Sequence, residues 1–387
     1  MKTTRYYTYV IFLIAATLFI LFDITYAASG LEKVYSMRKV IHDAEWYSEQ
    51  SALWKKEVTK NPENPDAWMN YYRATRYVVV FSSDRTIKNN PELLRIISEM
   101  EKSIPNTFEC NYMKYYQNSV PKSLKYLEAA YRIQPDNPVT YYDFISMSEI
   151  QRKIEKKREY CRKLWDSEDN ASSLMDYNYN MLNSTNENAI LFTNGDNDTY
   201  PVWMLQDVLS IRTDVLVLNL SLAHDRVYLK QILKENKIKL TKNNYNKFSV
   251  EALVKIIQEQ APDRPIYFAV TVYDAYKKKL EGDLYNTGLV FKYSKERIDN
   301  VAYILRNFED RYRLDYLEYN WYGDKRIENQ SAMLRLNLNY IPALVQLYKH
   351  YKVSGDLGRA NRCWNLGEKI AINSNSDELI DYLKQEK

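Results

Sequence analysis

Two aspartates and an asparagine, Asp196, Asn197 and Asp198, follow a short apolar run and form the clearest chemical pattern in the chain. Carboxylates two positions apart offer hard oxygen ligands of the kind that Mg²⁺, Mn²⁺ or Ca²⁺ prefers. A divalent cation held there could neutralise a diphosphate leaving group. The pattern therefore suggests Asp196 and Asp198 as metal ligands and Asn197 as a neighbouring ligand-binding residue.

A turn followed by a helix start explains much of the same segment without a ligand. Gly195 permits a tight turn, Asp198 or Thr199 can cap a helix, and Pro201 suits the first helical turn. An isolated Asp-x-Asp pair is a motif of low specificity. Capping accounts for Asp198 but leaves Asp196 as a solvated side chain. Both interpretations stay open at this point.

The segments around this motif alternate between strand and helix patterns. Short apolar runs predict strands, and amphipathic stretches between them predict helices. Strands that alternate with helices indicate a mostly parallel, Rossmann-like sheet with helices on both faces. The predicted strands are residues 189–193, 215–220, 266–272 and 288–293, and the predicted helices are residues 203–211, 227–235 and 250–260.

Ligands of such sheets bind beyond the carboxyl ends of the strands. In this chain Asn219 ends the second predicted strand and Asp274 follows the third, just as Asp196 to Asp198 follow the first. We therefore expect these side chains to converge on one sheet edge as a ligand site. His224 is expected at the surface, and the sequence contains no recognisable Ser/His/Asp set or phosphate-binding glycine loop.

Two proline-bracketed junctions, residues 61–68 and 134–141, have the same form on either side of a helical stretch. Proline stops one helix and suits the start of the next, so each junction predicts a helix–turn–helix. The spacing resembles the tetratricopeptide repeat. The C-terminal part matches that repeat best, through Leu347, Tyr351, Gly355, Ala360 and Trp364.

Stacked helical hairpins usually present a surface to another protein, although plain packing without a partner groove is the alternative. The net charge of +4 over 387 residues excludes a strongly basic nucleic-acid binder. The basic stretch 151–163 is interspersed with Glu155 and Glu159 and reads as a solvated helix face. Three widely spaced cysteines argue against a disulfide framework or a structural zinc site.

The N-terminus carries the pattern of an export signal. Lys2 and Arg5 precede the apolar run 10–22, and Ala27 ends a plausible cleavage site. The run is short for a membrane-spanning helix, which needs ~20 residues, but an uncleaved anchor is the alternative. We expect a periplasmic or cell-envelope protein whose only membrane contact is this segment, if it is not cleaved.

Residues 194–201 resemble a signature in a family of large bacterial envelope membrane proteins related to protein O-mannosyltransferases. The likeness continues through residues 211–215, 219–222, 264–268 and 280–282, and spans roughly residues 186–372. In that family the matching piece is the soluble C-terminal portion, which often continues into helical repeats. The membrane part that would hold a lipid-linked donor has no counterpart here. The resemblance therefore implies a relative of an accessory domain.

The expected fold is a small parallel-sheet α/β unit flanked by tetratricopeptide-like helical hairpins. Its expected parts are a signal segment at 1–27, a helical region at 30–185, an α/β domain at 186–330 and a helical repeat at 331–387. The expected function is an envelope scaffold that binds a protein partner without catalysis. The alternative is metal-dependent binding of a carbohydrate or nucleotide sugar, or a glycosyltransferase-related activity, at Asp196 and Asp198.

Overall fold

The computed structural model describes residues 30–83, 86–118, 122–240, 249–319 and 327–386. The predicted signal segment, 1–27, lies outside these residues. The chain divides into two compact units, Met1–Thr140 and Tyr141–Lys387, which we describe separately. Within the described ranges, no helix combines the length and the apolar character that a bilayer span requires.

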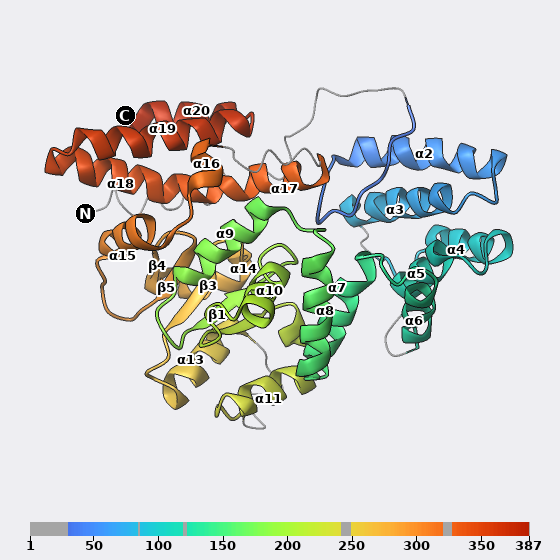
Figure 1. The fold of residues 1–387 in the computed structure, drawn as a ribbon, viewed down its shortest axis with the longest axis horizontal. Helices are drawn as coiled ribbons and strands as arrows, with labels where there is room; N and C mark the ends of the chain where they lie inside the picture. The colour runs from blue at the N-terminus through green and yellow to red at the C-terminus, as the bar shows by residue number, and fades with distance from the viewer. Residues whose placement is uncertain (1–29, 84–85, 119–121, 241–248, 320–326, 387) are drawn as a thin grey trace. The chain divides into compact units, whose positions relative to one another are not determined.

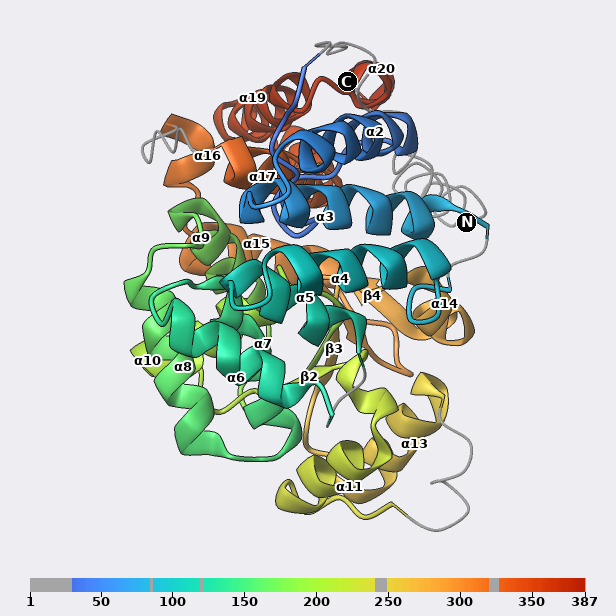
Figure 2. The same cartoon turned by 90° about the vertical axis from the view of Figure 1, so that its right-hand side faces the viewer.

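The first unit is built of helices joined by short turns (Figures 1 and 2). Polar side chains cap their starts, as when Asn64 accepts the Ala67 N–H and Asn90 accepts the N–H groups of Glu92 and Leu93. The predicted junction at 61–68 is confirmed as the turn between two packed helices. The helices are α2 (Ala44–Lys60), α3 (Pro65–Phe81), α4 (Pro91–Ser103), α5 (Phe108–Gln117) and α6 (Leu124–Ile133).

In the second unit, helices precede and follow the strands of a sheet along the chain. Three precede the sheet: α7, which begins at the unit boundary (Val139–Ile150), α8 (Ile154–Asp166) and α9 (Ser172–Asn183). After the sheet the longer helices pack as a hairpin, in which Gly355 adopts a φ of 82° and Asp356 caps the next helix. This confirms the predicted C-terminal turn. The later helices are α15 (Asn300–Arg306), α16 (Asp315–Tyr319), α17 (Ile327–Asn337), α18 (Ile341–Ser354), α19 (Leu357–Asn373) and α20 (Asp377–Glu386).

The sheet has five strands in the order β2-β1-β3-β5-β4. β1 pairs with β2 and β3 in parallel, whereas β3–β5 and β5–β4 are antiparallel. The strands are β1 (Ile190–Thr193), β2 (Leu216–Asn219), β3 (Ile266–Ala269), β4 (Leu284–Asn286) and β5 (Val290–Tyr293). The helices between them include α10 (Tyr200–Leu209), α11 (Arg226–Glu235), α13 (Val250–Gln260) and α14 (Asp274–Lys277).

The expectation of a mostly parallel, Rossmann-like sheet is therefore only partly right, because the sheet is mixed. A parallel connection needs a crossover of a dozen or more residues, and β4 and β5 are joined by three residues only. Gly288, at a φ of 118°, makes that reversal possible. The sequence pattern did not predict β4, whose residues are all only half-buried.

The core of the second unit lies on β1 and β3, whose residues are buried on both faces. Phe192 faces Phe268 across the parallel pair, with ring centroids 4.8 Å apart. The crossover from β1 to β2 runs through α10, and the crossover from β2 to β3 runs through α11 and α13. These two crossovers run in opposite directions along the sheet, and right-handed crossovers of that kind place their helices on opposite faces. The strand elements lie inside the predicted α/β segment, while the exact domain limits stay a prediction.

Candidate functional site

The Asp198 side chain closes the loop that follows β1. Its carboxylate accepts the N–H of Gly195 at 2.8 Å and that of Asn194 at 3.1 Å. The Thr199 hydroxyl lies 3.1 Å from the same carboxylate, and the Thr271 hydroxyl donates to it from the loop after β3. Asp198 therefore holds two loops together, in addition to its place beside the start of α10.

Burial governs the protonation of this side chain. Asp198 is 2% exposed, and this desolvation raises the pKa of its carboxyl above the ordinary value, while the donors from Thr271, Asn194 and Gly195 act in the opposite direction. A carboxylate already surrounded by donors offers few free oxygen lone pairs to a cation. The arrangement suits a structural connection between loops.

Asn219 joins the same polar cluster from the end of β2. Its Nδ2 donates to the Thr199 hydroxyl at 2.9 Å, and its Oδ1 accepts the Leu222 N–H at 2.9 Å. Thr199 Oγ1 also lies 2.8 Å from Thr193 Oγ1 in β1. Polar side chains from the carboxyl ends of β1, β2 and β3 thus meet at one edge, and Asp198 and Asn219 are the two predicted site residues among them.

The other predicted ligand residues have different surroundings. Asp196 is exposed, and its carbonyl accepts the Tyr200 N–H at 3.1 Å. Asn197 is half-buried, and its carbonyl accepts the Asn178 amide at 2.8 Å. Asp274 lies at the start of α14, where its carboxylate is 3.3 Å from the Lys277 ammonium. These geometries place the two predicted metal-binding carboxylates, Asp196 and Asp198, in solvent and in the core respectively.

Metal binding at this edge stays a prediction. In the ranges that the structure describes, no group of three or more His, Cys, Asp or Glu side chains is arranged to hold an ion. His224 is exposed, and its Nε2 lies 2.9 Å from the Tyr276 hydroxyl. The sequence reasoning missed Thr271 and Thr199 as members of the cluster. The third strand was predicted to extend to residue 272, so Thr271 was assigned to the strand, whereas β3 ends at Ala269 and Thr271 lies in the loop after it.

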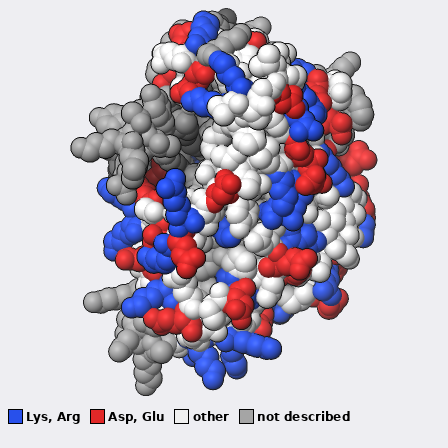
Figure 3. Space-filling view, turned by 90° about the vertical axis from the view of Figure 1, so that its left-hand side faces the viewer, with Lys and Arg blue, Asp and Glu red and all other residues white. Residues whose placement is uncertain are grey.

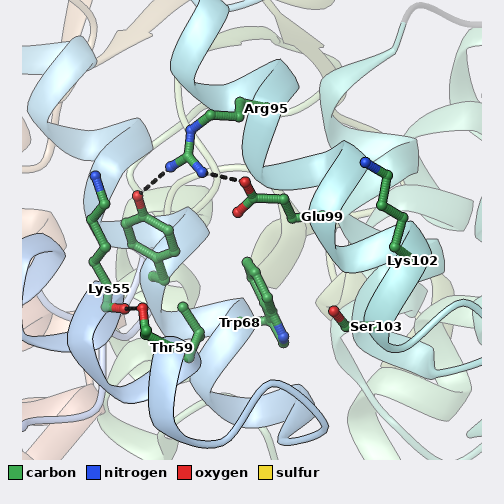
Figure 4. A pocket seen from close by; sticks show the side chains of 9 residues that line it. Lys55, Thr59, Trp68, Arg95, Glu99, Lys102 and Ser103 are labelled. Atoms are coloured by element: carbon green, nitrogen blue, oxygen red, sulfur yellow. Dashed lines mark hydrogen bonds and ion pairs between the residues drawn. The ribbon is translucent and has the colours of Figure 1, made fainter.

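A second candidate is a groove of about 320 Å³ between α2, α3 and α4 of the first unit (Figure 4). Trp68 and Tyr71 of α3 lie deep in it and are almost fully buried. The Trp68 Nε1 donates to the Pro62 carbonyl at 2.7 Å, which fixes the indole beside the α2–α3 turn. The lining residues are Lys55, Val58, Thr59, Trp68, Tyr71, Arg95, Glu99, Lys102 and Ser103.

Arg95 organises one side of this groove. Its guanidinium contacts Glu92 at 2.6 Å and Glu99 at 2.6 Å, and it donates to the Tyr71 hydroxyl at 2.9 Å. The hydrogen bond from Arg95 is the main cause that lowers the pKa of the Glu92 carboxyl to about 2. Arg95 is therefore a fixed wall of the groove with its charge already compensated.

Two lysines lie at the rim of the groove. Lys102 of α4 is exposed. Lys55 of α2 is also exposed, and its ammonium forms a long ion pair with the Glu92 carboxylate, at 3.9 Å. The groove therefore has ammonium groups at its mouth, which can pair with an acidic ligand, above aromatic side chains that are almost fully buried.

A buried group of charges connects the α7–α8 hairpin to α10 in the second unit. Lys157 is 7% exposed and lies 3.1 Å from Glu149 and 3.2 Å from Asp207. Desolvation opposes its charge, but these two carboxylates outweigh it and raise the pKa of Lys157. Tyr228 of α11 donates to Glu149 at 3.0 Å. Because each ion has partners, the cluster is structural in character.

Positive and negative side chains are interspersed on the face of the molecule that Figure 3 shows. Figure 3 shows Lys and Arg mixed with Asp and Glu among the described residues of that face, without an extended stripe of one sign. This agrees with the net charge of +4. The pattern is unlike the basic stripe with which proteins bind a nucleic-acid backbone.

Comparison with known proteins gives one family match. The model described as TMEM260-associated domain 2 matches residues 174–238, which include β1, β2 and the loop that holds Asp198. The match supports the predicted relationship over these residues, and it does not show a bacterial origin. No curated protein matches the chain.

Among solved structures, the crystal structure of yeast Tom70 aligns with 97% of this chain and 69% of that chain, at 11% identity and a TM-score of 0.29. A TM-score this low does not establish a shared fold.

Proposed function

We propose that this chain is an exported scaffold that binds a protein partner through its helical hairpins, without a catalytic step of its own. The groove between α2, α3 and α4 is the observation that carries the proposal. It offers a concave surface with aromatic side chains at its base and charged side chains at its rim, which is the usual composition of a site for another chain.

The rim indicates the chemistry of the partner. Glu92 and Glu99 already neutralise Arg95, whereas Lys55 and Lys102 project from opposite sides of the mouth (Figure 4). An acidic segment with an apolar or aromatic residue beside the carboxylate would fit both features. The carboxylate would pair with the lysines, and the apolar side chain would enter the groove toward Trp68.

Site-specific photocrosslinking tests the proposal in the envelope of an expressing cell. A photoreactive phenylalanine at Ser103, which lines the groove, should form one discrete adduct with a partner protein. The adduct should disappear when Lys55→Glu and Lys102→Glu are combined. Lys56→Glu with Lys60→Glu is the matched control, because these exposed lysines of α2 do not line the groove. Absence of an adduct, or an adduct that ignores the Lys55 and Lys102 changes, contradicts the proposal.

Localisation in the cell envelope is part of the same proposal. It rests on the basic and apolar pattern of the first 27 residues, which lie outside the described part of the chain. N-terminal sequencing of the protein recovered from the envelope fraction should begin at Ala28. A chain that retains Met1 and extracts only with detergent would instead support the anchor.

Binding of a divalent cation with a carbohydrate or nucleotide sugar at the sheet edge is the second candidate. The exposed Asp196 and the meeting of three strand ends favour it, and the burial of Asp198 opposes it. Binding should raise the unfolding temperature by mass action in the presence of Mn²⁺, Mg²⁺ or Ca²⁺ with a sugar nucleotide. An unchanged temperature, or an equal rise in Asp196→Ala, would falsify this candidate.

A further inference from the structure

The segment that precedes α2 lies as an extended arm against α2 and α3. We use "arm" for residues 30–37 and "arm site" for the side chains of α2 and α3 that contact it. The arm has no strand partner among the described residues, yet its main chain is bonded by side chains at alternate positions. Alternating exposure accompanies these bonds, with Leu31 and Lys33 exposed and Val34 fully buried.

Val34 is the anchor of the arm. Its N–H donates to Asn70 Oδ1 at 2.7 Å, and its carbonyl accepts from the Arg73 guanidinium at 3.3 Å. Asn70 is itself fixed by donating to the Asp66 carbonyl at 2.8 Å. The Val34 side chain enters a cluster formed by Tyr47 and Ala74, with Trp46, Trp54, Tyr77 and Val78 packed around it.

The residue two positions earlier is held in the same manner. The Glu32 N–H donates to Gln50 Oε1 at 2.9 Å, and the Glu32 carbonyl accepts from the Trp54 indole at 2.8 Å. The other end of the Gln50 amide donates to the Gly30 carbonyl at 3.0 Å. Gln50 is 1% exposed, so its amide is buried with its hydrogen-bonding capacity directed at the arm.

These contacts have the properties of a peptide-binding site. Glu32 and Val34, two positions apart, each have both their N–H and their C=O groups bonded by side chains, which resembles strand addition with side chains in place of a sheet edge. Specificity comes from one pocket, which takes a β-branched apolar side chain. The ligand is supplied by the chain itself, through the tight turn in which Lys39 N–H bonds the Ser36 carbonyl at 2.8 Å.

We propose that the arm is exchangeable, and that the partner for which the arm site is built is the arm of a second copy of this chain. The second copy offers the same Glu32 and Val34 groups in the same order, so each of these contacts can also form between two chains. The short link through residues 38–43 gives the chain's own arm a high effective concentration, on the order of mM, and this favours the closed monomer at low protein concentration.

Complementation between two full-length variants tests the exchange. Val34→Asp impairs the arm and leaves the arm site unchanged, whereas Gln50→Ala with Asn70→Ala impairs the arm site and leaves the arm unchanged. Each variant alone should remain a monomer. An equimolar mixture should form a heterodimer by light scattering after size exclusion, because one intact arm then meets one intact arm site.

A labelled peptide of residues 30–40 provides the second measurement. It should bind the Val34→Asp chain saturably and bind the unaltered chain about tenfold or more weakly, because the tethered arm competes. The same peptide with Asp at the Val34 position should not bind. Val34→Ser replaces Val34→Asp if circular dichroism shows that the latter is unfolded. A monomeric mixture of folded variants, or equal binding of the two peptides, overturns the proposal.

Discussion

The Thr271 hydroxyl donates a hydrogen bond to the buried carboxylate of Asp198, and this bond ties the loop after β3 to the loop after β1. The crossover from β1 leads to β2 on one side, and the next crossover leads from β2 to β3 on the other side of β1, so the direction of the crossovers reverses beside β1. In open α/β sheets the crevice at this reversal is the usual ligand site. Here the side chains of the protein itself bridge it.

Removing the Thr271 hydroxyl should destabilise the second unit. Thr271→Val keeps the shape of the side chain but leaves a buried carboxylate with one donor fewer. We expect a loss of ~1–3 kcal/mol in the free energy of unfolding, measured with urea. Thr271→Ser restores the hydroxyl and should recover most of the loss. Equal stability of the valine and serine variants would show that the bond contributes nothing.

The Arg95–Glu92 pair should make stability depend on pH in the acid range. The pKa of Glu92 falls from 4.5 to about 2 on folding. A carboxyl with a lowered folded-state pKa stabilises the protein above its unfolded pKa, and this contribution is lost as the pH falls from about 4.5 through about 2. Glu92→Gln should therefore flatten the dependence of unfolding free energy on pH in that window.

The matched control for this measurement is Glu63→Gln, which changes an exposed carboxylate in the α2–α3 turn. It should leave the slope of stability against pH as it is in the unaltered chain. A steep slope that persists in Glu92→Gln would mean that other carboxyls dominate acid unfolding. Asp214 is the next residue to examine, since hydrogen bonding from Arg212 lowers the pKa of its carboxyl to about 2.

Loss of the Lys157 ammonium should be among the costliest single changes. Lys157→Met removes the cation that Glu149 and Asp207 share, while Glu149 keeps its ion pair with Arg152. Breaking a buried ion group in this way costs about 3–5 kcal/mol. Glu149→Gln added to Lys157→Met should recover part of the loss. Lys156→Met, on the exposed side of α8, should be nearly neutral in the same chemical unfolding experiment.

Gly288→Ala should destabilise the sheet more than Gly355→Ala destabilises the C-terminal hairpin. Both glycines have positive φ, but a Cβ at Gly288 would lie 2.3 Å from the Tyr312 hydroxyl, and nothing approaches one at Gly355. The conformational penalty alone is about 1 kcal/mol for each. The crowding at Gly288 adds to it, and Tyr312→Phe should relieve that part. Thermal unfolding of the three variants separates the two effects.

The sequence predicted a helix or a turn well where a local pattern of residues determines it. Residues 250–260 carry a clean helical period and form α13 over the same span, and Gly355 marks the C-terminal turn correctly. The polar edge was predicted in outline, because parallel strands must end on the same side. Its actual bonding was not, since Asp198 and Thr271 are 73 positions apart in the chain and no local pattern pairs them.

The features that the sequence did not predict depend on contacts between residues far apart in the chain. β4 is short and only half-buried, so it gives no apolar run to detect. The antiparallel direction of β5 follows from the three-residue reversal at Gly288, which reads in the sequence as an ordinary loop. The arm before α2 has no strand period that extends beyond a few residues, and its place depends on Gln50 and Asn70 at a distance.

Lys157 pairs with carboxylates on two other helices, and this limits where the polypeptide can be divided into fragments. Because α8 supplies the ammonium and α10 supplies Asp207, the hairpin before the sheet and the first crossover helix belong to one cooperative folding unit. A fragment that begins at residue 186 would carry the sheet but lack its cation, and would leave Asp207 without the charge it was buried beside. We therefore expect a fragment cut at this boundary to be less stable than the same residues in the whole chain.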